Sequence, residues 1–433
     1  MEEKRYESRQ GVPLYVYSNP ALHSFYFALY VRAGSLYEDE GEQGIAHMLE
    51  HILIRNVNVR SGGVLYRTLD RLGLEFNAST YRDCIQFYVS GARTHIAAAA
   101  ELLCRLFAPI ALSAQDYEAE RRRIKAEIRE SDDKNTLSSF TAACLYPDTS
   151  GRFSILGTNR SVTGISQRRL EAYRGRVMCP ENMFFYLTGN VKDADVATLL
   201  RAVDAYELPH GQGLTERPTR PAAFGRRDGA VYVKGADYTM ARLSFDVDMS
   251  EVSYAACDLL CDALFTGYNA RFFLELSEAR GMCYDLSGGA DRYHSIGCLY
   301  VTFEVKGRDL YDAVAASVEL LREAKAHPMS PDVIPTALYV DGADMLLDDA
   351  SELNFTMAYD AHILACPYRT LEDRKAAYRA VTPEELMAAA RAIFCFDRCT
   401  LTVKGDKKAI DRDRLRELLR RLDLPYDETE KGN

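Results

Sequence analysis

The feature that constrains the fold most is a break rich in proline and glycine between Pro209 and Gly229. It contains three prolines, four glycines and few apolar residues, so it can continue neither a helix nor a central strand. The break divides the 433-residue chain into two parts of similar length. We therefore predict a first domain over residues 1–208, a linker over 209–229 and a second domain over 230–433.

The two parts share an order of expected elements. Each opens with an apolar, β-rich run, at Phe25–Val31 and at Leu243–Val247, and continues with a helical pattern. A glycine then leads into a strand that contains an aromatic residue, at Gly73–Thr80 and at Gly281–Gly288, and a second strand follows in both parts. Strands at hairpin spacing that alternate with helices predict two related α+β units.

Composition restricts the classes of partner. The 53 Lys and Arg residues against 63 Asp and Glu residues give a net charge of −10. This argues against nucleic acid or an anionic membrane as the main partner, because both attract clustered basic charge. No apolar run approaches 18 residues, so we expect no transmembrane helix, and the first residues show no apolar signal core. Eleven cysteines without a CxxC pair indicate reduced thiols, and we expect a cytoplasmic protein.

The stretch 44–53 carries the residues with the most specific chemistry. On a helix with about 100° per residue, one side carries the apolar residues Ile45, Met48, Leu49 and Ile52. The opposite side carries His47, Glu50 and His51. Two histidines one turn apart can converge on one metal ion, and Glu50 is placed to reach a water on that ion. This HxxEH pattern inverts the order of the HExxH zinc motif. The alternative is that two histidines on a helix surface lie four residues apart by chance.

A third metal ligand must come from elsewhere, because a catalytic zinc usually takes three protein ligands and leaves one position for water. The expected helix over residues 117–130 offers four candidates, namely Glu118, Glu120, Glu127 and Glu130. Glu120 and Glu127 lie seven residues apart and therefore share a face. Spacing alone does not choose among the four, and a solvated charged helix is the alternative interpretation.

On these residues the chain resembles the inverted-motif zinc peptidases typified by pitrilysin, insulin-degrading enzyme and the mitochondrial processing peptidase. His47 and His51 match the motif, and Glu127 lies 76 residues after His51, the interval at which that family places its third ligand. Glu120 matches the second carboxylate of the family. The resemblance therefore implies a Zn²⁺ cofactor held by His47, His51 and Glu127. It also implies Glu50 as the residue that activates water and Glu120 as a residue that orients a ligand histidine.

The resemblance also implies the architecture. Members of the family have two homologous α+β domains, each a mainly antiparallel sheet with packed helices, which face each other across a cleft. The second part of the chain lacks a His and Glu set in the stretch Ala256–Leu264, which aligns with the motif helix. We therefore expect a single metal site. The strand Glu75–Thr80 resembles the family's active-site edge strand, so Asn77 and Ala78 are predicted to bind an extended peptide.

One position departs from the family. Tyr284 matches a tyrosine of the family and is a further predicted substrate contact. Active single-chain members carry an arginine seven residues before this tyrosine, and the corresponding residue here is Ser277. Arg280 is no obvious substitute, because the family commonly has a basic residue there as well. A serine cannot supply a charged, forked donor, so a contribution of about 2–4 kcal/mol at the transition state is expected to be missing. Either a residue such as Arg271 or Arg292 compensates, or a partner chain supplies the arginine.

These observations predict a zinc-dependent endopeptidase that hydrolyses peptides or unfolded segments. We expect it to work with a homologous partner subunit as a heterodimer, with a homodimer as the other possibility. Maturation of a small modified peptide is the role that the compact members of the family suggest. The alternatives are a non-catalytic peptide-binding or structural subunit of a complex and a zinc hydrolase of non-peptide amides.

Overall fold

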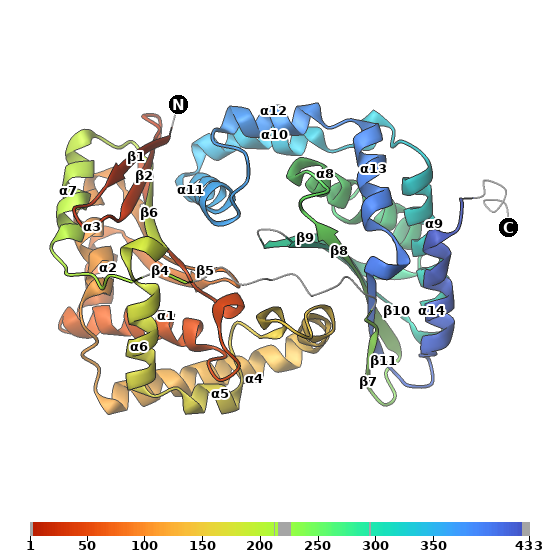
Figure 1. Ribbon diagram of the computed structural model, residues 1–433, viewed down its shortest axis with the longest axis horizontal. Coiled ribbons are helices and arrows are strands. Elements are labelled where there is room, and N and C mark those ends of the chain that lie inside the picture. The colour runs from red at the N-terminus through yellow and green to blue at the C-terminus, as the bar shows by residue number, and fades with distance from the viewer. Residues whose placement is uncertain (1–2, 212, 215–226, 294–295, 427–433) are drawn as a thin grey trace. The chain divides into compact units, whose positions relative to one another are not determined.

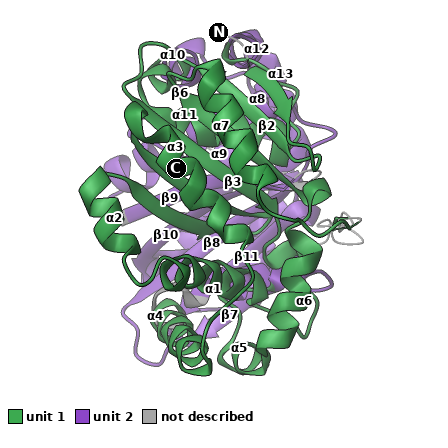
Figure 2. Cartoon of the chain, turned by 90° about the vertical axis from the view of Figure 1, so that its left-hand side faces the viewer, with its two compact units in different colours: residues 1–136, 153–218, 343–371 green, residues 137–152, 219–342, 372–433 purple. Residues whose placement is uncertain are grey.

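The computed structural model describes residues 3–211, 213–214, 227–293 and 296–426, without the side chains of residues 132–136, 284 and 296 (Figure 1). The chain forms two compact units (Figure 2). The first comprises residues 1–136, 153–218 and 343–371, and the second comprises residues 137–152, 219–342 and 372–433. Most of the predicted linker, residues 209–229, lies outside the described residues, and the domain boundaries expected from the sequence remain a prediction.

The first unit contains a six-stranded sheet in the order β1-β2-β6-β3-β5-β4. Its strands are β1 (Glu3–Glu7), β2 (Pro13–Ser18), β3 (Ser24–Arg32), β4 (Glu75–Thr80), β5 (Cys84–Ala92) and β6 (Met183–Gly189). Only the β2–β6 pair is parallel among these strands; the other pairs are antiparallel. Strands β3 and β6 lie inside the sheet and are almost wholly buried, which agrees with their runs of apolar and aromatic residues.

The sheet of the second unit repeats this order. Its five strands run β7-β11-β8-β10-β9. They are β7 (Gly229–Tyr232), β8 (Tyr238–Asp248), β9 (Cys283–Tyr293), β10 (Ile296–Lys306) and β11 (Cys399–Gly405). The β7–β11 pair is parallel and the other pairs are antiparallel. The order and directions match those of strands β2-β6-β3-β5-β4 in the first sheet, so β1 is the one strand of that sheet without a counterpart among the described strands. The predicted α+β fold of two related, mainly antiparallel units is therefore confirmed.

The first unit also contains helices that pack on its sheet or on one another. They are α1 (Ile45–Arg60), α2 (Leu65–Leu72), α3 (Ile96–Cys104), the first part of α4 (Ala114–Leu145), α5 (Asn159–Gly164), α6 (Gln167–Val177) and α7 (Asp193–Asp204). The apolar side of α1 packs into a core formed with alternate residues of β3 and β5, such as Leu29 and Phe87. The polar side of α1 is thereby turned away from the core, which decides where the motif residues point.

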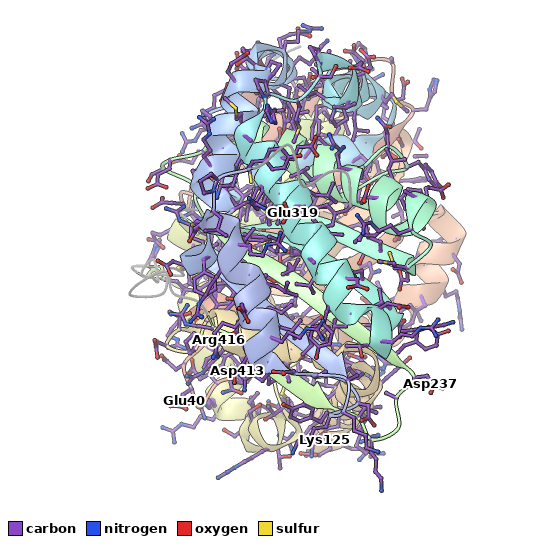
Figure 3. All side chains as sticks on the ribbon, turned by 90° about the vertical axis from the view of Figure 1, so that its right-hand side faces the viewer. Glu40, Lys125, Asp237, Glu319, Asp413 and Arg416 are labelled. Carbon is purple, nitrogen blue, oxygen red and sulfur yellow. The ribbon has the colours of Figure 1, made fainter. Side chains whose placement is uncertain are left out.

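The second unit has its own helices and the last part of α4. They are α8 (Tyr254–Phe265), α9 (Leu310–Ala326), α10 (Thr336–Met345), α12 (Leu371–Ala380), α13 (Pro383–Ile393) and α14 (Arg412–Arg420). Helices α9 and α14 lie side by side on this unit (Figure 3). Glu319 of α9 forms an ion pair with Arg421 just after α14, with 2.7 Å between Oε1 and Nη2. No helix in the described ranges is both long and apolar enough to cross a membrane.

Helix α11 (Ala350–Ala358) comes from the second half of the chain but belongs to the first unit. Its residues Leu353 and Met357 pack against Tyr26, Tyr30 and other residues of β3 and β6. This is the face of the sheet opposite to α1, because successive side chains of a strand point to opposite faces. Helix α11 thus covers the second face of this sheet. It is distant from β3 in sequence, because Tyr30 and Asn354 are more than 300 residues apart.

Asn354 anchors α11 to this sheet. Its side chain is fully buried; Oδ1 accepts from the Tyr30 hydroxyl at 3.0 Å, and Nδ2 donates to the carbonyls of Tyr26 at 3.0 Å and Tyr186 at 3.1 Å. A buried amide with all these partners specifies where the helix sits, because an apolar residue would leave the tyrosine hydroxyl without an acceptor.

We expect Asn354→Leu to lower the free energy of unfolding of the first unit by about 3 kcal/mol, since it removes these hydrogen bonds within the core. Urea denaturation monitored by tyrosine fluorescence measures the loss. Asn159→Leu, at an exposed position at the start of α5, is the matched control and should change stability by less than about 0.5 kcal/mol. Equal stability of the two variants would contradict the anchoring role of Asn354.

Candidate metal centre

The start of α1 is held by a buried carboxylate. Glu38 is 1% exposed, and its two oxygens accept from the backbone N–H groups of Gly44, at 2.8 Å, and Ala46, at 3.1 Å. Burial raises the pKa of Glu38 to about 8, although the backbone hydrogen bonds act in the opposite direction. Gly44 has a φ of 82°, and a side chain here would meet the Leu156 carbonyl oxygen at 2.7 Å. The helix therefore begins at a defined residue, which sets the direction of its polar side.

The predicted two-sided character of α1 is present in the structure. Ile45, Met48, Leu49 and Ile52 are all fully buried in the core. On the polar side, the rings of His47 and His51 lie 4.6 Å apart between centroids, with an angle of 70° between the planes. The two imidazoles thus lie beside each other, as the spacing of four residues predicts.

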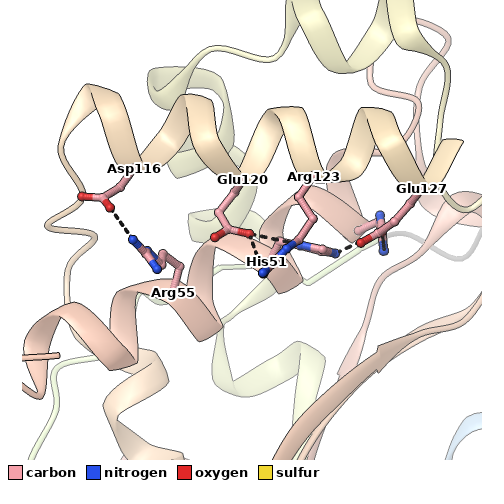
Figure 4. Close-up of polar contacts among 7 residues, drawn as sticks. His51, Arg55, Asp116, Glu120, Arg123 and Glu127 are labelled. Carbon is pink, nitrogen blue, oxygen red and sulfur yellow. Dashed lines mark hydrogen bonds and ion pairs between the residues drawn. The ribbon is translucent and has the colours of Figure 1, made fainter. Parts of the chain in front are cut away.

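The first part of α4 lies alongside α1 and presents a row of acidic residues to it (Figure 4). Glu127 Oε2 lies 3.7 Å from His47 Nε2 and 3.5 Å from His51 Nε2. Glu120 Oε2 lies 3.4 Å from Nδ1 of His51, on the other side of that ring. Of the remaining candidates, Glu118 pairs with Arg121 on its own helix. The packing of the two helices therefore places Glu127, and not Glu118, beside both histidines.

An ion pair at one end of this interface was not expected from the sequence. Arg55, one turn beyond His51 on α1, donates to Asp116 of α4 with 2.6 Å between Nη2 and Oδ1. Arg123 Nη1 also lies 3.3 Å from Glu120 Oε2. The Arg55–Asp116 pair joins α1 to α4 and helps to set their register, whereas the Arg123–Glu120 contact lies within α4. Register decides which carboxylate reaches the imidazoles. The sequence does contain a signal for the two contacts between the helices. Asp116 and Glu120 are four residues apart on α4, and their partners Arg55 and His51 are also four residues apart on α1.

The three donor atoms lie within 4.8 Å of one another, and the two separations that involve Glu127 fit a tetrahedral metal ion. Zinc bonds of about 2.0–2.2 Å at tetrahedral angles place the ligand atoms about 3.4 Å apart, close to the 3.5 and 3.7 Å seen from Glu127 to the two imidazoles. Within the described part of the chain, His47, His51 and Glu127 form the one group of three or more potential ligands that converges in this way. Glu127 is 38% exposed, whereas the imidazoles are 11% and 13% exposed, so the group is open to solvent on the side of Glu127.

The neutral form of His47 and the tautomer of His51 suit metal binding. Burial, reinforced by the neighbouring His51, lowers the pKa of His47 to about 3, so its imidazole is neutral and keeps a lone pair. Burial also acts to lower the pKa of His51, but its hydrogen bond with Glu120 and the charges of Glu127 and Glu50 outweigh it and raise that pKa. The same hydrogen bond lowers the pKa of Glu120. An ionised Glu120 favours the His51 tautomer with its proton on Nδ1, which leaves Nε2 free to bind a metal.

Glu50 lies on the same side of α1 and contacts the edge strand. Its Oε2 accepts from the Thr80 hydroxyl at 2.6 Å. Burial raises the pKa of Glu50, and the hydrogen bond from Thr80 partly offsets this effect. A carboxylate with a raised pKa close to a metal site suits proton transfer near neutral pH. The contact with Thr80 was not predicted from the sequence, where Thr80 appears only as the last residue of the expected strand.

The predicted peptide-binding residues Asn77 and Ala78 lie on β4, at the edge of the sheet. The described strands pair with β4 on one side only, through β5. Asn77 is exposed and Ala78 is half-buried, and the Asn77 side chain accepts from the backbone N–H of Ala78 at 2.9 Å. An edge strand of this kind offers backbone groups to an added strand.

The remaining predicted contacts belong to the second unit. Tyr284 lies in β9, and its side chain is outside the described residues. Ser277 is half-buried in a π-helix over Phe273–Ala279. The two arginines considered as replacements are already paired within the second unit. Arg271 lies 2.7 Å from Glu323, and Arg292 lies 2.9 Å from Asp258.

Family models match most of the chain. The model described as insulinase (peptidase family M16) matches residues 15–152, and the model described as peptidase M16 inactive domain matches residues 164–337. The chain belongs to peptidase family M16. This confirms the resemblance inferred from the HxxEH stretch, and the first match contains all the predicted metal ligands.

Several proteins similar to this chain are named zinc proteases or peptidases. An uncharacterized zinc protease of Mycobacterium tuberculosis is 24% identical over 409 residues, which cover 90% of this chain and 91% of that protein. The uncharacterized zinc protease YmxG of Bacillus subtilis is 21% identical over 91% of this chain and 96% of its own length. The β subunit of the mitochondrial processing peptidase of Blastocladiella emersonii is 27% identical over 53% of this chain and 52% of its own length. These names agree with the predicted Zn²⁺ cofactor.

Solved structures confirm the M16 fold. The peptidase M16 inactive domain of Pseudomonas fluorescens superposes with a TM-score of 0.85 at 18% identity, covering 94% of this chain and 99% of that one. A protease of Helicobacter pylori superposes with a TM-score of 0.79 at 16% identity, covering 93% and 99% of the two chains. At these identities the likeness establishes the architecture of the chain, and the chemistry must be argued from its own residues.

Proposed function

We propose that this protein is a zinc-dependent endopeptidase that acts on peptides or unfolded segments. His47, His51 and Glu127 hold the zinc ion, and Glu50 is the general base. The observation that carries this proposal is the convergence of three donor atoms from two helices within 4.8 Å of one another, with Glu127 at tetrahedral spacing from both imidazoles. The position of Glu50 one residue before His51, with its carboxylate held by Thr80, supports the second assignment.

The reaction follows from the roles of these residues. A bound zinc ion would lower the pKa of a water and polarise the scissile carbonyl. Glu50 takes a proton from the attacking water and then passes it to the departing amine. Glu120 fixes the His51 ring through Nδ1. The peptide lies extended beside β4 and contacts Asn77 and Ala78, and Tyr284 contributes a further substrate contact.

We also propose that a homologous partner subunit completes the enzyme as a heterodimer, with a homodimer as the alternative. Ser277 cannot supply the charged donor that active single-chain relatives are expected to use. The ion pairs of Arg271 with Glu323 and of Arg292 with Asp258 reduce the availability of either arginine as a replacement. A role in maturing a small modified peptide remains part of this proposal. None of the eleven cysteines, all of which lie within the described residues, forms a disulfide bond, and this supports a reducing compartment such as the cytoplasm.

The second candidate is a non-catalytic peptide-binding subunit, which the presence of Ser277 favours. The same test separates the two functions. The purified chain is analysed for bound metal and then incubated with a peptide library, alone and with candidate homologous chains. The proposal expects about one zinc per chain and cleavage that appears or increases with a partner. A chain that binds zinc but cleaves nothing with any homologous partner, or one that binds no zinc, would overturn the endopeptidase assignment.

Replacing Glu120 with Gln is expected to weaken zinc binding by about 10- to 100-fold, because a neutral amide orients the His51 ring less firmly. Competition with a chelator of known affinity measures this change. Glu118→Gln is the matched control, since Glu118 lies on the same helix and pairs with Arg121 instead. Equal zinc affinity of the two variants would contradict the orienting role of Glu120.

A further inference from the structure

The Glu50 carboxylate receives a hydrogen bond from the strand beside which the substrate is proposed to lie. Thr80 Oγ1 donates to Glu50 Oε2 over 2.6 Å in a part-buried setting. Thr80 is the last residue of β4 and pairs with Ile85 of β5. Among the described residues, no other group donates a hydrogen bond to Glu50. The orientation of this carboxylate therefore depends on one hydroxyl.

Thr80 is suited to direct a carboxylate. Its side chain is β-branched, so it has few rotamers, and its backbone is fixed by the ladder with β5. Glu50, in contrast, has three side-chain torsions and can point in several directions. The threonine hydroxyl carries a single proton, which goes to Oε2. Oε1 of Glu50 then remains available to accept a proton from water.

The turn that follows Thr80 is also held in place. The N–H of Tyr81 donates to the Cys84 carbonyl at 2.8 Å and closes the turn between β4 and β5. Within the turn, the buried carboxylate of Asp83 accepts from the Tyr359 hydroxyl, with oxygen–oxygen distances of 2.9 and 2.8 Å. Tyr359 begins the π-helix that follows α11. The end of β4 is therefore tied to a second element, and Thr80 is a rigid donor.

We infer that Thr80 is a positioning residue that holds the Glu50 carboxylate in the orientation required for proton transfer. This inference rests on the proposed endopeptidase function and deepens it. It makes the end of the edge strand part of the machinery that activates water, in addition to its role as a platform for the peptide. Thr80 does not itself exchange a proton with the substrate, so its effect should appear in turnover and not in substrate binding.

The test compares Thr80→Val, Thr80→Ser and the wild type, with the partner subunit present if the enzyme requires one. Valine keeps the branched shape and removes the hydroxyl, so kcat is expected to fall by about 10- to 100-fold while KM changes by less than about twofold. Serine restores the hydroxyl and should restore most of kcat. Zinc content and Tm should stay at wild-type values in both variants.

Two further measurements exclude a merely structural role. Thr198→Val makes the same change at a half-buried position of α7, where the hydroxyl donates to the Ala194 carbonyl and accepts from Arg201 on the same helix, and should leave kcat unchanged. Crystal structures of the metal-free variants should show the Glu50 carboxylate displaced in Thr80→Val and in place in Thr80→Ser. This readout does not depend on activity.

The outcomes separate the two proposals. If the wild type binds zinc but hydrolyses no peptide, the endopeptidase function fails and this inference falls with it. If the wild type is active and Thr80→Val keeps its kcat, or Thr80→Ser does not recover it, the inference alone is overturned. A Thr80→Val variant that loses zinc or unfolds at a lower temperature also overturns it, because the hydroxyl would then support the fold and not the base.

Discussion

Glu50→Gln is expected to lower kcat by about 100- to 10,000-fold while the protein still binds one zinc ion. The amide has nearly the same size and shape as the carboxylate, and its carbonyl oxygen can still accept from the Thr80 hydroxyl at the position seen for Oε2. It cannot take a proton from water, however, so the step assigned to Glu50 is lost. The three predicted metal ligands are untouched, which separates metal binding from turnover.

This result is checked by steady-state hydrolysis of a cleaved library peptide together with metal analysis of the same samples. Glu101→Gln, at an exposed position of α3, makes the same chemical change away from the site and should retain full activity. Peptide hydrolysis at the wild-type rate by Glu50→Gln would falsify the role of Glu50 as the general base. Loss of zinc from this variant would instead indicate that Glu50 contributes to the metal site.

Glu127→Ala is expected to reduce zinc affinity by more than about 100-fold. Loss of a residue that only orients a ligand costs about 10- to 100-fold, and Glu127 is proposed to bind the ion itself. The variant keeps His47 and His51 but loses the third donor, which lies 3.7 and 3.5 Å from their Nε2 atoms. With two imidazoles as the remaining protein ligands, two of the four coordination positions of the ion would have no protein ligand. Catalytic zinc sites usually have three protein ligands. Hydrolysis should disappear at zinc concentrations that saturate the wild type.

Zinc titration against a chelator measures the loss of affinity. The informative control is Glu130→Ala, because Glu130 lies three residues further along α4 at an exposed position and was an equal candidate from spacing alone. Glu130→Ala should bind zinc as the wild type does. If Glu130→Ala loses zinc and Glu127→Ala retains it, the ligand set proposed here is wrong.

The metal centre shows which parts of a site follow from local sequence. The pairing of His47 with His51 depends only on helical geometry within one element, so four-residue spacing was sufficient to predict it. The choice of Glu127 over Glu118 depends on how α4 packs against α1. Spacing within α4 carries no information about that packing; the family resemblance supplied the choice, and the structure supports it with the 3.5 Å approach of Glu127 to His51.

Some features of the fold also follow from local sequence, whereas others depend on packing between distant segments. Alternating strand and helix patterns predicted the repeated α+β units, and the matching strand orders of the two sheets confirm them. The pattern gave no indication that α11 would cover the sheet of the first unit, since an apolar helix face is compatible with many apolar surfaces. Asn354 makes this choice specific, but its partners, such as Tyr30, are separated from it by more than 300 residues.

By itself, the sequence determined the helix that carries His47, Glu50 and His51, the presence of two related α+β units and the family, because these depend on periodicity and spacing along the chain. The tertiary structure decided three further points: the approach of Glu127 to the imidazoles, the hydrogen bond from Thr80 to Glu50 and the place of α11. Each of these depends on the packing of elements that are distant in sequence. Such contacts are set by the shape and polarity of whole faces, which no local pattern records.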